Sequence, residues 1–471
     1  MSIALTHATV IDATGSPAQP DRTVLVRDGR IAVVGRSSEV EVPADAEILD
    51  GSGKFVIPGL ADMHVHTDDN ENVYLPLYLV NGITTTRQMA GQPYLHEWRR
   101  RIAEGTLLGP RLSIGSKLVE GDPGLWDGFP PETRAQLTHT AADPDAARRI
   151  VRTVHEEGAD FVKVYSRLHR DVYFALVDEA QRVGIPVAGH TPDEVPVTEV
   201  AAAGQVSIEH VHALFPATSK NDAAHLAALA RMNVGSGAYA EWFHQVNEIE
   251  WAAAHTYSPF TAEKVFQRLV AHGTAYTPTL TMHRILDQPH LGSLGDDRLR
   301  YLPADLRGTW EWVHDNAYAL GRTPEEAFRR SVLYQRRLAV TKAMADAGVR
   351  LLAGTDNPAV FGFHGFDLHQ ELELFVTAGL TPMQALQTAT REPARFLGVA
   401  DTAGTVQEGR NADLVVLDAN PLADIRNTTR IHAVVVAGRL IDAAERTRML
   451  AAIEAAASGM PDRPRTATGC R

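Results

Sequence analysis

Short runs in which hydrophobic and polar residues alternate lie at both ends of the chain. The runs are Ile3 to Ile11, Arg22 to Val26, Arg30 to Val34, Ala412 to Leu417 and Ile431 to Gly438. Alternation of this kind, bounded by turn residues such as Asp28-Gly29, is typical of β-strands. We therefore expect residues 1–57 and 404–443 to join into one small β-sandwich built from both chain termini.

A different pattern fills the middle of the chain, where a helix-like stretch, a glycine and a short β-branched run repeat. The glycines are Gly82, Gly158, Gly184, Gly204, Gly273 and Gly348. Because glycine just past a helix end adopts the left-handed conformation, each one marks a helix-to-strand junction. Two further strands are expected near Val56 to His66 and near Arg111 to Gly115. The sequence thus predicts an α/β fold in which residues 58–403 form a (β/α)8 TIM barrel.

Composition narrows the class of protein. The 471 residues are 44% hydrophobic and 22% charged, which excludes a disordered or coiled-coil chain, and the single cysteine, Cys470, excludes a cysteine-built metal site. The net charge of −13 argues against nucleic acid or a membrane surface as a partner. The first residues lack a signal-peptide pattern, so we expect a cytoplasmic protein. Residues 444–471 are expected to form a C-terminal helix and a mobile tail.

Four of the predicted barrel strands end in residues of types that bind metals. His64 and His66 are two apart and therefore share one face of the first strand, while His190 and His210 end the fifth and sixth strands and Asp356 ends the eighth. Taken singly, each has a structural explanation: a histidine that only forms hydrogen bonds at a strand end, or an aspartate that caps a turn. A barrel collects its active residues at this end of the strands, so we expect them to meet.

Lys163 lies in the fourth strand, on the same face as Phe161 and Tyr165. Burial disfavours the charged ammonium and lowers its pKa, which makes the neutral amine available for carbamylation by carbon dioxide. The resulting carbamate is an anionic oxygen ligand. The alternative is an interior lysine held in an ion pair.

The spacing of these residues agrees with the barrel. Lys163 and His190 are 27 residues apart and His190 and His210 are 20 apart, each enough for one helix and a return strand. The 146 residues from His210 to Asp356 are too many for two such units. We therefore expect an insertion near residues 215–265.

The chain resembles the amidohydrolase superfamily of binuclear metal enzymes. The resemblance lies in the ordered set His64, His66, Lys163, His190, His210 and Asp356, with Ile57 to Met63 before it and Glu408 to Val416 after it. The segments Lys163-Val164-Tyr165 and Ser207 to His210 look most like the branch related to imidazolonepropionase. That branch includes Xaa-Pro dipeptidase-like enzymes and the ochratoxin, phenylurea and molinate hydrolases. The resemblance implies a metal-dependent hydrolase that cleaves an amide, peptide, urea or carbamate C–N bond of a small molecule, and a homo-oligomer.

The resemblance also implies a role for each candidate ligand. His64, His66 and Asp356 are expected to hold the more buried of two divalent ions and His190 and His210 the other, bridged by the carbamate of Lys163 and by a hydroxide that attacks the substrate. Zinc is the usual occupant, and Co²⁺ or Mn²⁺ could substitute. Asp356 is expected to take the proton of the nucleophile and deliver it to the leaving nitrogen.

Further side chains are candidates for contact with substrate. Tyr165 either hydrogen-bonds the developing oxyanion or is structural. His364 is expected to reach the substrate from the loop after the eighth strand, and Arg87 is expected to form a salt bridge. The predicted insertion carries six aromatic residues, which form either a helical core or an apolar lid that would favour aromatic or alkyl substrates: Tyr239, Trp242, Phe243, Trp251, Tyr257 and Phe260.

Two other functions remain open. A deaminase of the same superfamily would use a single metal ion and no bridging lysine, and a non-catalytic scaffold would keep the barrel without the chemistry. Lys163 argues against the deaminase, and the complete set of six ligands argues against the scaffold.

Overall fold

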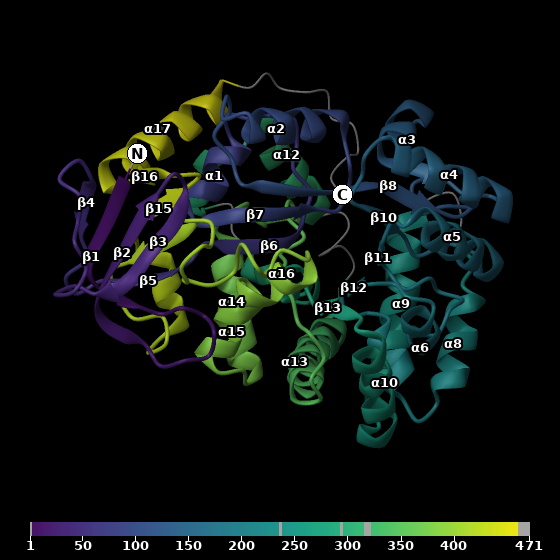
Figure 1. Cartoon of the computed structure of the whole chain (residues 1–471). Coiled ribbons are helices and arrows are strands. Elements are labelled where there is room, and N and C mark those ends of the chain that lie inside the picture. Colours follow the sequence, from purple (N-terminus) through teal and green to yellow (C-terminus); the bar gives the residue numbers. More distant parts are fainter. Residues whose placement is uncertain (1, 235–237, 293–294, 315–321, 460–471) are drawn as a thin grey trace.

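A parallel β-barrel with helices around it forms the centre of the molecule (Figure 1). The computed structural model describes residues 2–234, 238–292, 295–314 and 322–459. The neighbouring barrel strands are, in order, β6 (Leu60–Val65), β7 (Ile83–Gln88), β8 (Arg111–Glu120), β10 (Phe161–Val164), β11 (Val187–Gly189), β12 (Ser207–Glu209) and β13 (Ala275–Thr277). All six pairs of neighbours are parallel. The predicted TIM-barrel fold is confirmed.

The predicted eighth strand closes the barrel without becoming a regular strand. Leu351 bridges Tyr276 of β13, and Asn357 bridges Val65 of β6. Between them, Met63 N donates to the Ala353 carbonyl at 2.8 Å. This segment therefore joins the first and last barrel strands through isolated bridges.

Helices connect the barrel strands and cover the outside of the barrel. They are α1 (Tyr74–Val80), α2 (Pro93–Ala103), α3 (Pro131–Leu137), α4 (Pro144–Glu156), α5 (Arg170–Val183), α6 (Val197–Ala202), α10 (Pro259–His272), α11 (Leu280–Asp287), α12 (Ala304–Val313), α13 (Pro324–Asp346), α14 (Asp367–Ala378), α15 (Pro382–Thr388) and α16 (Arg391–Phe396). The six glycines predicted at helix-to-strand junctions all have φ between 70° and 92°. These left-handed positions confirm the predicted junctions, since a side chain there would be strained.

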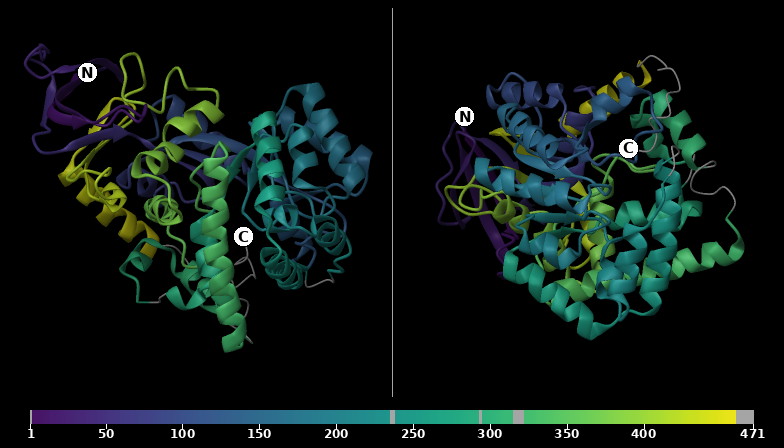
Figure 2. Two further views of the ribbon diagram at one scale, coloured as in Figure 1. Left: turned by 90° about the horizontal axis from the view of Figure 1, so that it is seen from below. Right: turned by 90° about the vertical axis from the view of Figure 1, so that its right-hand side faces the viewer.

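The two chain termini share a second sheet beside the barrel (Figure 2). Its strands are β1 (Ser2–Val10), β2 (Gln19–Arg27), β3 (Arg30–Arg36), β4 (Glu47–Asp50), β5 (Phe55–Pro58), β14 (Leu414–Leu417), β15 (Ile431–Val436) and β16 (Arg439–Ile441). Antiparallel pairing of β5 with β14, with Val56 opposite Val416, joins the two ends of the chain. The predicted C-terminal helix is α17 (Ala443–Ser458), and the predicted tail from residue 460 on lies outside the described residues.

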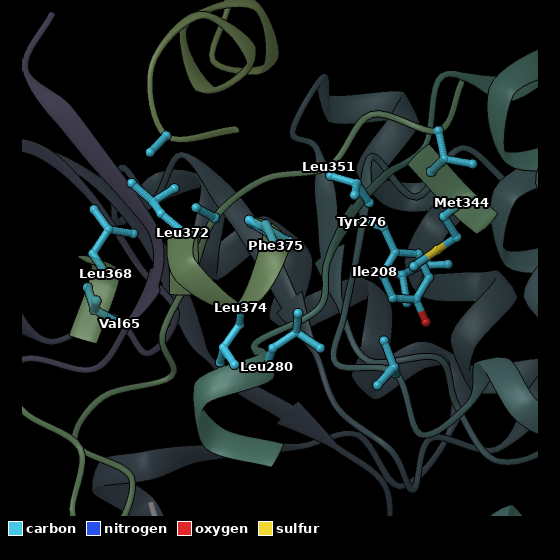
Figure 3. Close-up of a cluster of buried hydrophobic side chains, with 14 of the residues drawn as sticks. Val65, Ile208, Tyr276, Leu280, Met344, Leu351, Leu368, Leu372, Leu374 and Phe375 are labelled. Carbon is cyan, nitrogen blue, oxygen red and sulfur yellow. The ribbon is translucent and has the colours of Figure 1, made fainter. Parts of the chain in front are cut away.

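Buried apolar side chains fill the space between the barrel strands and the helices. Figure 3 shows Ile208 and Tyr276 from two barrel strands grouped with Leu351 and with Met344 of α13. Alternation places these side chains on the outer face of the strands, which leaves the inner face free for polar residues. Within the described residues, every helix is too short or too polar to cross a lipid bilayer.

Additional helices lie between β12 and α10, where the sequence predicts an insertion. They are α7 (Leu214–Thr218), α8 (Asp222–Ala230) and α9 (Ala238–His255). Trp242 and Val246 of α9 pack against Leu118 and Trp126, which belong to β8 and to the loop after it. The insertion therefore covers the carboxyl end of the barrel on the side of β8 and β10.

Candidate metal centre

The six predicted ligand side chains line one cavity of about 190 Å³ at the carboxyl end of the barrel strands. Parallel strands end at the same rim, so residues far apart in the sequence meet there. The ligands and their positions are His64 at the end of β6, His66 just after it, Lys163 in β10, His190 after β11, His210 after β12 and Asp356 in the closing segment.

His64, His66 and Asp356 form the tightest group. Asp356 Oδ1 lies 3.0 Å from His64 Nε2 and 3.1 Å from His66 Nε2. One potential ligand atom from each residue lies within 4.8 Å of the other two. Two imidazoles and a carboxylate at this separation suit one divalent cation.

His190 and His210 lie next to this group. The rings of His64 and His210 are 4.9 Å apart and those of His190 and His210 4.8 Å apart, and His210 Nε2 lies 3.9 Å from Asp356 Oδ2. The two carboxylate oxygens of Asp356 thus face different histidines.

Hydrogen bonds to Nδ1 orient three of the four imidazoles. His64 Nδ1 donates to Glu209 Oε2 at 3.0 Å, His190 Nδ1 is bonded to Ser166 Oγ at 2.8 Å, and His210 Nδ1 to Thr279 Oγ1 at 2.7 Å. When Nδ1 of a neutral imidazole carries the proton, Nε2 has the lone pair with which it could bind a metal ion.

Left-handed backbone conformations concentrate at this centre. His210 has φ of 65°, Thr279 of 49° and Asp356 of 61°, and none of them is glycine. Each such residue costs about 1–3 kcal/mol and persists only where the surrounding contacts hold it. Here His210 N donates to the Thr277 carbonyl and Asp356 N to the His64 carbonyl, both at 2.8 Å. The fold therefore holds these side chains in fixed positions although the strained backbone lowers its stability.

Lys163 is the unusual member of the set. Its side chain is 1% exposed, and within the described structure Nζ has no hydrogen-bond partner. Burial lowers the pKa of Lys163 from 10.5 to about 8, against the opposing effect of Glu209 and Asp356. An amine in this environment is partly neutral near pH 8 and has the lone pair that carbamylation requires.

The pKa values of the other candidate ligands also favour the binding of a cation. Burial lowers the pKa of His190 and of His210 well below the usual range, so both imidazoles are neutral. Burial raises the pKa of Asp356, but the contacts with His64 and His66 oppose this and bring it well below its usual value. Neutral imidazoles and an ionised carboxylate are the forms that bind metal ions.

A buried ion pair supports this centre; it joins Arg87, for which the sequence predicts a salt bridge, to Glu209, which the sequence pattern did not single out. Arg87 Nη2 donates to Glu209 Oε1 at 2.7 Å, and both side chains are fully buried. Arg87 also donates to Ser207 Oγ at 2.8 Å, and Glu209 in turn holds His64. The predicted salt bridge of Arg87 is thus confirmed. The available signal was the polar pair Ser207 and Glu209 at alternate positions of a barrel strand, which period two assigns to the inner face.

Removing the charge of Glu209 tests this support. Glu209→Gln is expected to lower the free energy of unfolding by about 3–5 kcal/mol, because it leaves the Arg87 guanidinium buried without an anion. Urea denaturation at a fixed metal concentration measures the change. The matched control is Glu104→Gln, which breaks the exposed pair with Arg100 and is expected to cost less than about 0.5 kcal/mol. Equal losses of unfolding free energy in the two variants would contradict the supporting role of the buried Arg87–Glu209 pair.

The other predicted substrate contacts occupy different surroundings. Tyr165 lines the cavity, with its ring centroid 4.2 Å from that of His190. His364 is fully buried and is not among the residues that line the cavity; its Nε2 donates to the His66 carbonyl at 2.9 Å. Burial lowers the pKa of His364 to about 4. In this position His364 supports the backbone of a ligand residue, and its contact with substrate stays a prediction.

The aromatic residues of the insertion divide into two groups. Tyr239, Trp242 and Phe243 line the cavity together with Trp126 from the loop after β8. Trp251, by contrast, packs against His255, and Phe260 is 68% exposed. The aromatic residues in the first half of α9 therefore form an apolar wall over the centre, whereas Trp251 packs against a residue of its own helix.

Further polar residues of the cavity have no signal in the sequence. The ring of His212 stacks on that of His210 at 5.4 Å, and His283 Nε2 accepts the backbone N–H of Val211 at 3.2 Å. Glu250, Asp287 and Arg337 complete the lining on this side. They come from three different helices, so no local pattern relates them.

Comparisons with known proteins agree with this geometry. A sequence model of the amidohydrolase family matches residues 55–441. Ochratoxinase from Aspergillus niger is 24% identical over 473 residues, which covers 88% of this chain and 81% of its own length. Imidazolonepropionase from Chromobacterium violaceum is 25% identical over 425 residues, covering 87% and 89%. The solved structure of a bottromycin amidohydrolase matches 98% of this chain and 91% of its own, with a TM-score of 0.74 and 25% identity.

The resemblance seen in the order of the ligand residues is therefore confirmed over most of the chain. The chain belongs to the amidohydrolase family, and it is a hydrolase that acts on C–N bonds.

Proposed function

We propose that the protein uses two divalent metal ions to hydrolyse an amide, peptide, urea or carbamate bond of a small molecule. The observation that carries this proposal is the buried Lys163 amine, which has no hydrogen-bond partner in the described structure and lies in a cavity with four histidines and Asp356. An unpaired buried amine is costly unless it is modified or coordinated. Carbamylation would convert it into the anionic oxygen ligand that two cations can share.

The donor set fits the ions. His64, His66 and Asp356 would hold one ion, His190 and His210 the other, and the carbamate of Lys163 would contact both. Zinc suits this mixture of nitrogen and oxygen ligands, and Co²⁺ or Mn²⁺ are alternatives. Two bound ions would supply a water of lowered pKa and polarise the scissile carbonyl.

Asp356 and Tyr165 are the side chains to which we assign proton transfer and charge stabilisation. The carboxylate of Asp356, ionised and in contact with histidines on both sides, would accept the proton of the attacking water and donate it to the leaving nitrogen. The phenol of Tyr165, on the rim of the same cavity, would donate a hydrogen bond to the developing oxyanion.

The wall of the cavity favours apolar substrates. Leu118, Trp126, Tyr239, Trp242 and Phe243 line one side of it. Aromatic and aliphatic surfaces of this kind bind the apolar part of a ligand, while a few polar groups fix its orientation. We therefore expect a small molecule with an aromatic or alkyl group next to the scissile bond.

Tyr165→Phe is expected to lower kcat about a hundredfold with little change in metal content. The substitution removes one hydrogen bond to the oxyanion and keeps the ring that packs on His190. Steady-state kinetics with elemental analysis of the same sample measures both quantities. A variant with wild-type kcat would assign Tyr165 a structural role.

The test of the proposed function is a substrate screen on protein loaded with Zn²⁺, Co²⁺ or Mn²⁺ in the presence of bicarbonate. The substrates are 4-nitroanilides, N-acyl amino acids, prolyl dipeptides, phenylureas and carbamates. We expect two ions per chain and cleavage of at least one class. One ion per chain with release of ammonia would instead indicate a mononuclear deaminase, and no bound metal with no turnover would indicate a scaffold.

A further inference from the structure

Two carboxylates and one guanidinium meet at the wall of the cavity, outside the candidate metal ligands. Glu250 belongs to α9, Asp287 ends α11 and Arg337 belongs to α13; each is at most 2% exposed, and all three line the cavity. Arg337 donates from Nη1 and Nη2 to the two oxygens of Glu250 at 2.6 and 2.9 Å, and from Nε to Asp287 Oδ2 at 2.8 Å. We call these three residues the acidic triad.

The triad carries more negative than positive charge. The guanidinium is bonded to both carboxylates, whereas Asp287 Oδ1 is buried and accepts no hydrogen bond within the described residues. Burial raises the pKa of Asp287 in spite of Arg337, as expected for a carboxylate that is not fully compensated. A second arginine behind the triad, Arg330, is bonded to Glu326 and lies over the Phe243 ring. Two carboxylates thus share one guanidinium, and Asp287 Oδ1 is the acceptor of the triad left without a partner among the described residues.

Aromatic side chains stand on the same helix face as one of these carboxylates. Trp242, Val246 and Glu250 are spaced by four residues along α9, so they follow one another on the side that lines the cavity. Phe243 and Tyr239 add further ring surface to this side. Aromatic faces beside a carboxylate bind ammonium groups, through the ring quadrupole and a charge-assisted hydrogen bond.

The triad lies one layer of side chains away from the metal centre. Arg337 adds to the effect of burial in lowering the pKa of His212 and of His283. His212 stacks directly on the candidate ligand His210. A substrate whose carbonyl sits at the metal centre could therefore reach the triad with a short flexible chain.

Within the part of the cavity that the structure describes, the cationic side chains are Lys163 and Arg337. Lys163 belongs to the metal centre, and Arg337 is bonded to two carboxylates. Next to the triad, away from the candidate metal centre, a carboxylate on the substrate would therefore meet two like charges rather than an available cationic side chain, which disfavours its binding there.

We propose that the acidic triad selects substrates with a positively charged amine, separated by a short alkyl or aryl chain from the C–N bond that is cleaved. This inference rests on the proposed hydrolase function for the position of the scissile bond. It assigns Asp287 and Glu250 as specificity-determining residues that do not take part in the chemical step.

Three substrates of matched length test whether the enzyme prefers a positively charged amine at this distance from the scissile bond. They are the 4-nitroanilides of 6-aminohexanoic acid, hexanoic acid and adipic acid, which end in an ammonium, a methyl group and a carboxylate. With metal-loaded protein we expect kcat/KM for the ammonium substrate to exceed that for the methyl substrate roughly ten- to a hundredfold, and the carboxylate substrate to be the poorest. A best rate with the carboxylate substrate, or equal rates with all three, would overturn the proposal while leaving the hydrolase function intact.

A substitution shows whether the triad causes the preference. Asp287→Asn keeps an oxygen acceptor for Arg337 and removes one charge, so it is expected to reduce the ratio of kcat/KM between the ammonium and methyl substrates about tenfold. The matched control is Glu248→Gln, an exposed position of the same helix, which should leave this ratio unchanged. An unchanged ratio in Asp287→Asn would overturn the assignment.

Binding separates this inference from the proposed function. Hexylammonium, hexan-1-ol and hexanoate are titrated into the metal-loaded wild-type protein by calorimetry, which requires no turnover. Tighter binding of hexylammonium by about tenfold or more supports the triad even if none of the anilides is cleaved. Equal binding of the three probes, or preferred binding of hexanoate, overturns it whatever the hydrolase assays show.

Discussion

Lys163→Ala is expected to reduce kcat/KM on the order of 10³-fold or more and to lower the metal content from two ions per chain to one or fewer. The Lys163 amine is buried, has no hydrogen-bond partner in the described structure and has a pKa lowered to about 8 by burial. If its carbamate is the oxygen ligand shared by both ions, its loss removes a ligand from each of them. Activation of water and polarisation of the carbonyl then fail together.

Elemental analysis and steady-state kinetics on the same preparation measure this result. A matched control is Lys220→Ala, an exposed lysine at the start of the insertion, which should behave as the wild type. Mass spectrometry of the wild-type protein under non-denaturing conditions with bicarbonate should also reveal an added carbon dioxide that the Lys163 variant lacks. Full activity with two bound ions in Lys163→Ala would contradict the proposed centre.

Asp356→Asn is expected to lower kcat by roughly 10² to 10⁴ while the protein still binds metal, because asparagine keeps a ligand oxygen but cannot accept a proton. The left-handed backbone at Asp356 and its contacts with His64 and His66 hold the side chain at the centre, and asparagine tolerates the same conformation. The loss should therefore fall on the chemical step rather than on folding.

Kinetics with several leaving groups sharpen this second test. Substrates with good leaving groups such as 4-nitroaniline need less protonation of the nitrogen, so they should lose less rate in the variant than alkyl amides do. Asp69→Asn, an exposed position on the loop after β6, serves as the control for the loss of one carboxylate near the cavity. Turnover retained in Asp356→Asn with unchanged metal content would assign the proton transfer to another group.

The sequence alone predicted the barrel, the shared terminal sheet and the six residues now found along one cavity. These predictions rest on local rules. Glycines after helix ends, β-branched runs and a period of two in strands depend on neighbouring residues only, and the carboxyl ends of parallel strands must meet at one rim. The ligand residues could be recognised because each ends a strand or lies next to its end.

The remaining parts of the site depend on contacts that no local pattern relates. His64 and Glu209 are 145 positions apart, and Glu250 and Arg337 are 87 apart. His364, predicted on a loop near the substrate, donates to the His66 carbonyl from a fully buried position, a contact that the sequence does not indicate. Which charges become neighbours is set by how the helices of the insertion and α13 pack across the barrel rim. The sequence by itself determined where the candidate metal ligands lie along the strands. Only the tertiary structure decided which buried charges surround them, because burial and charge pairing are properties of packed elements and not of a segment.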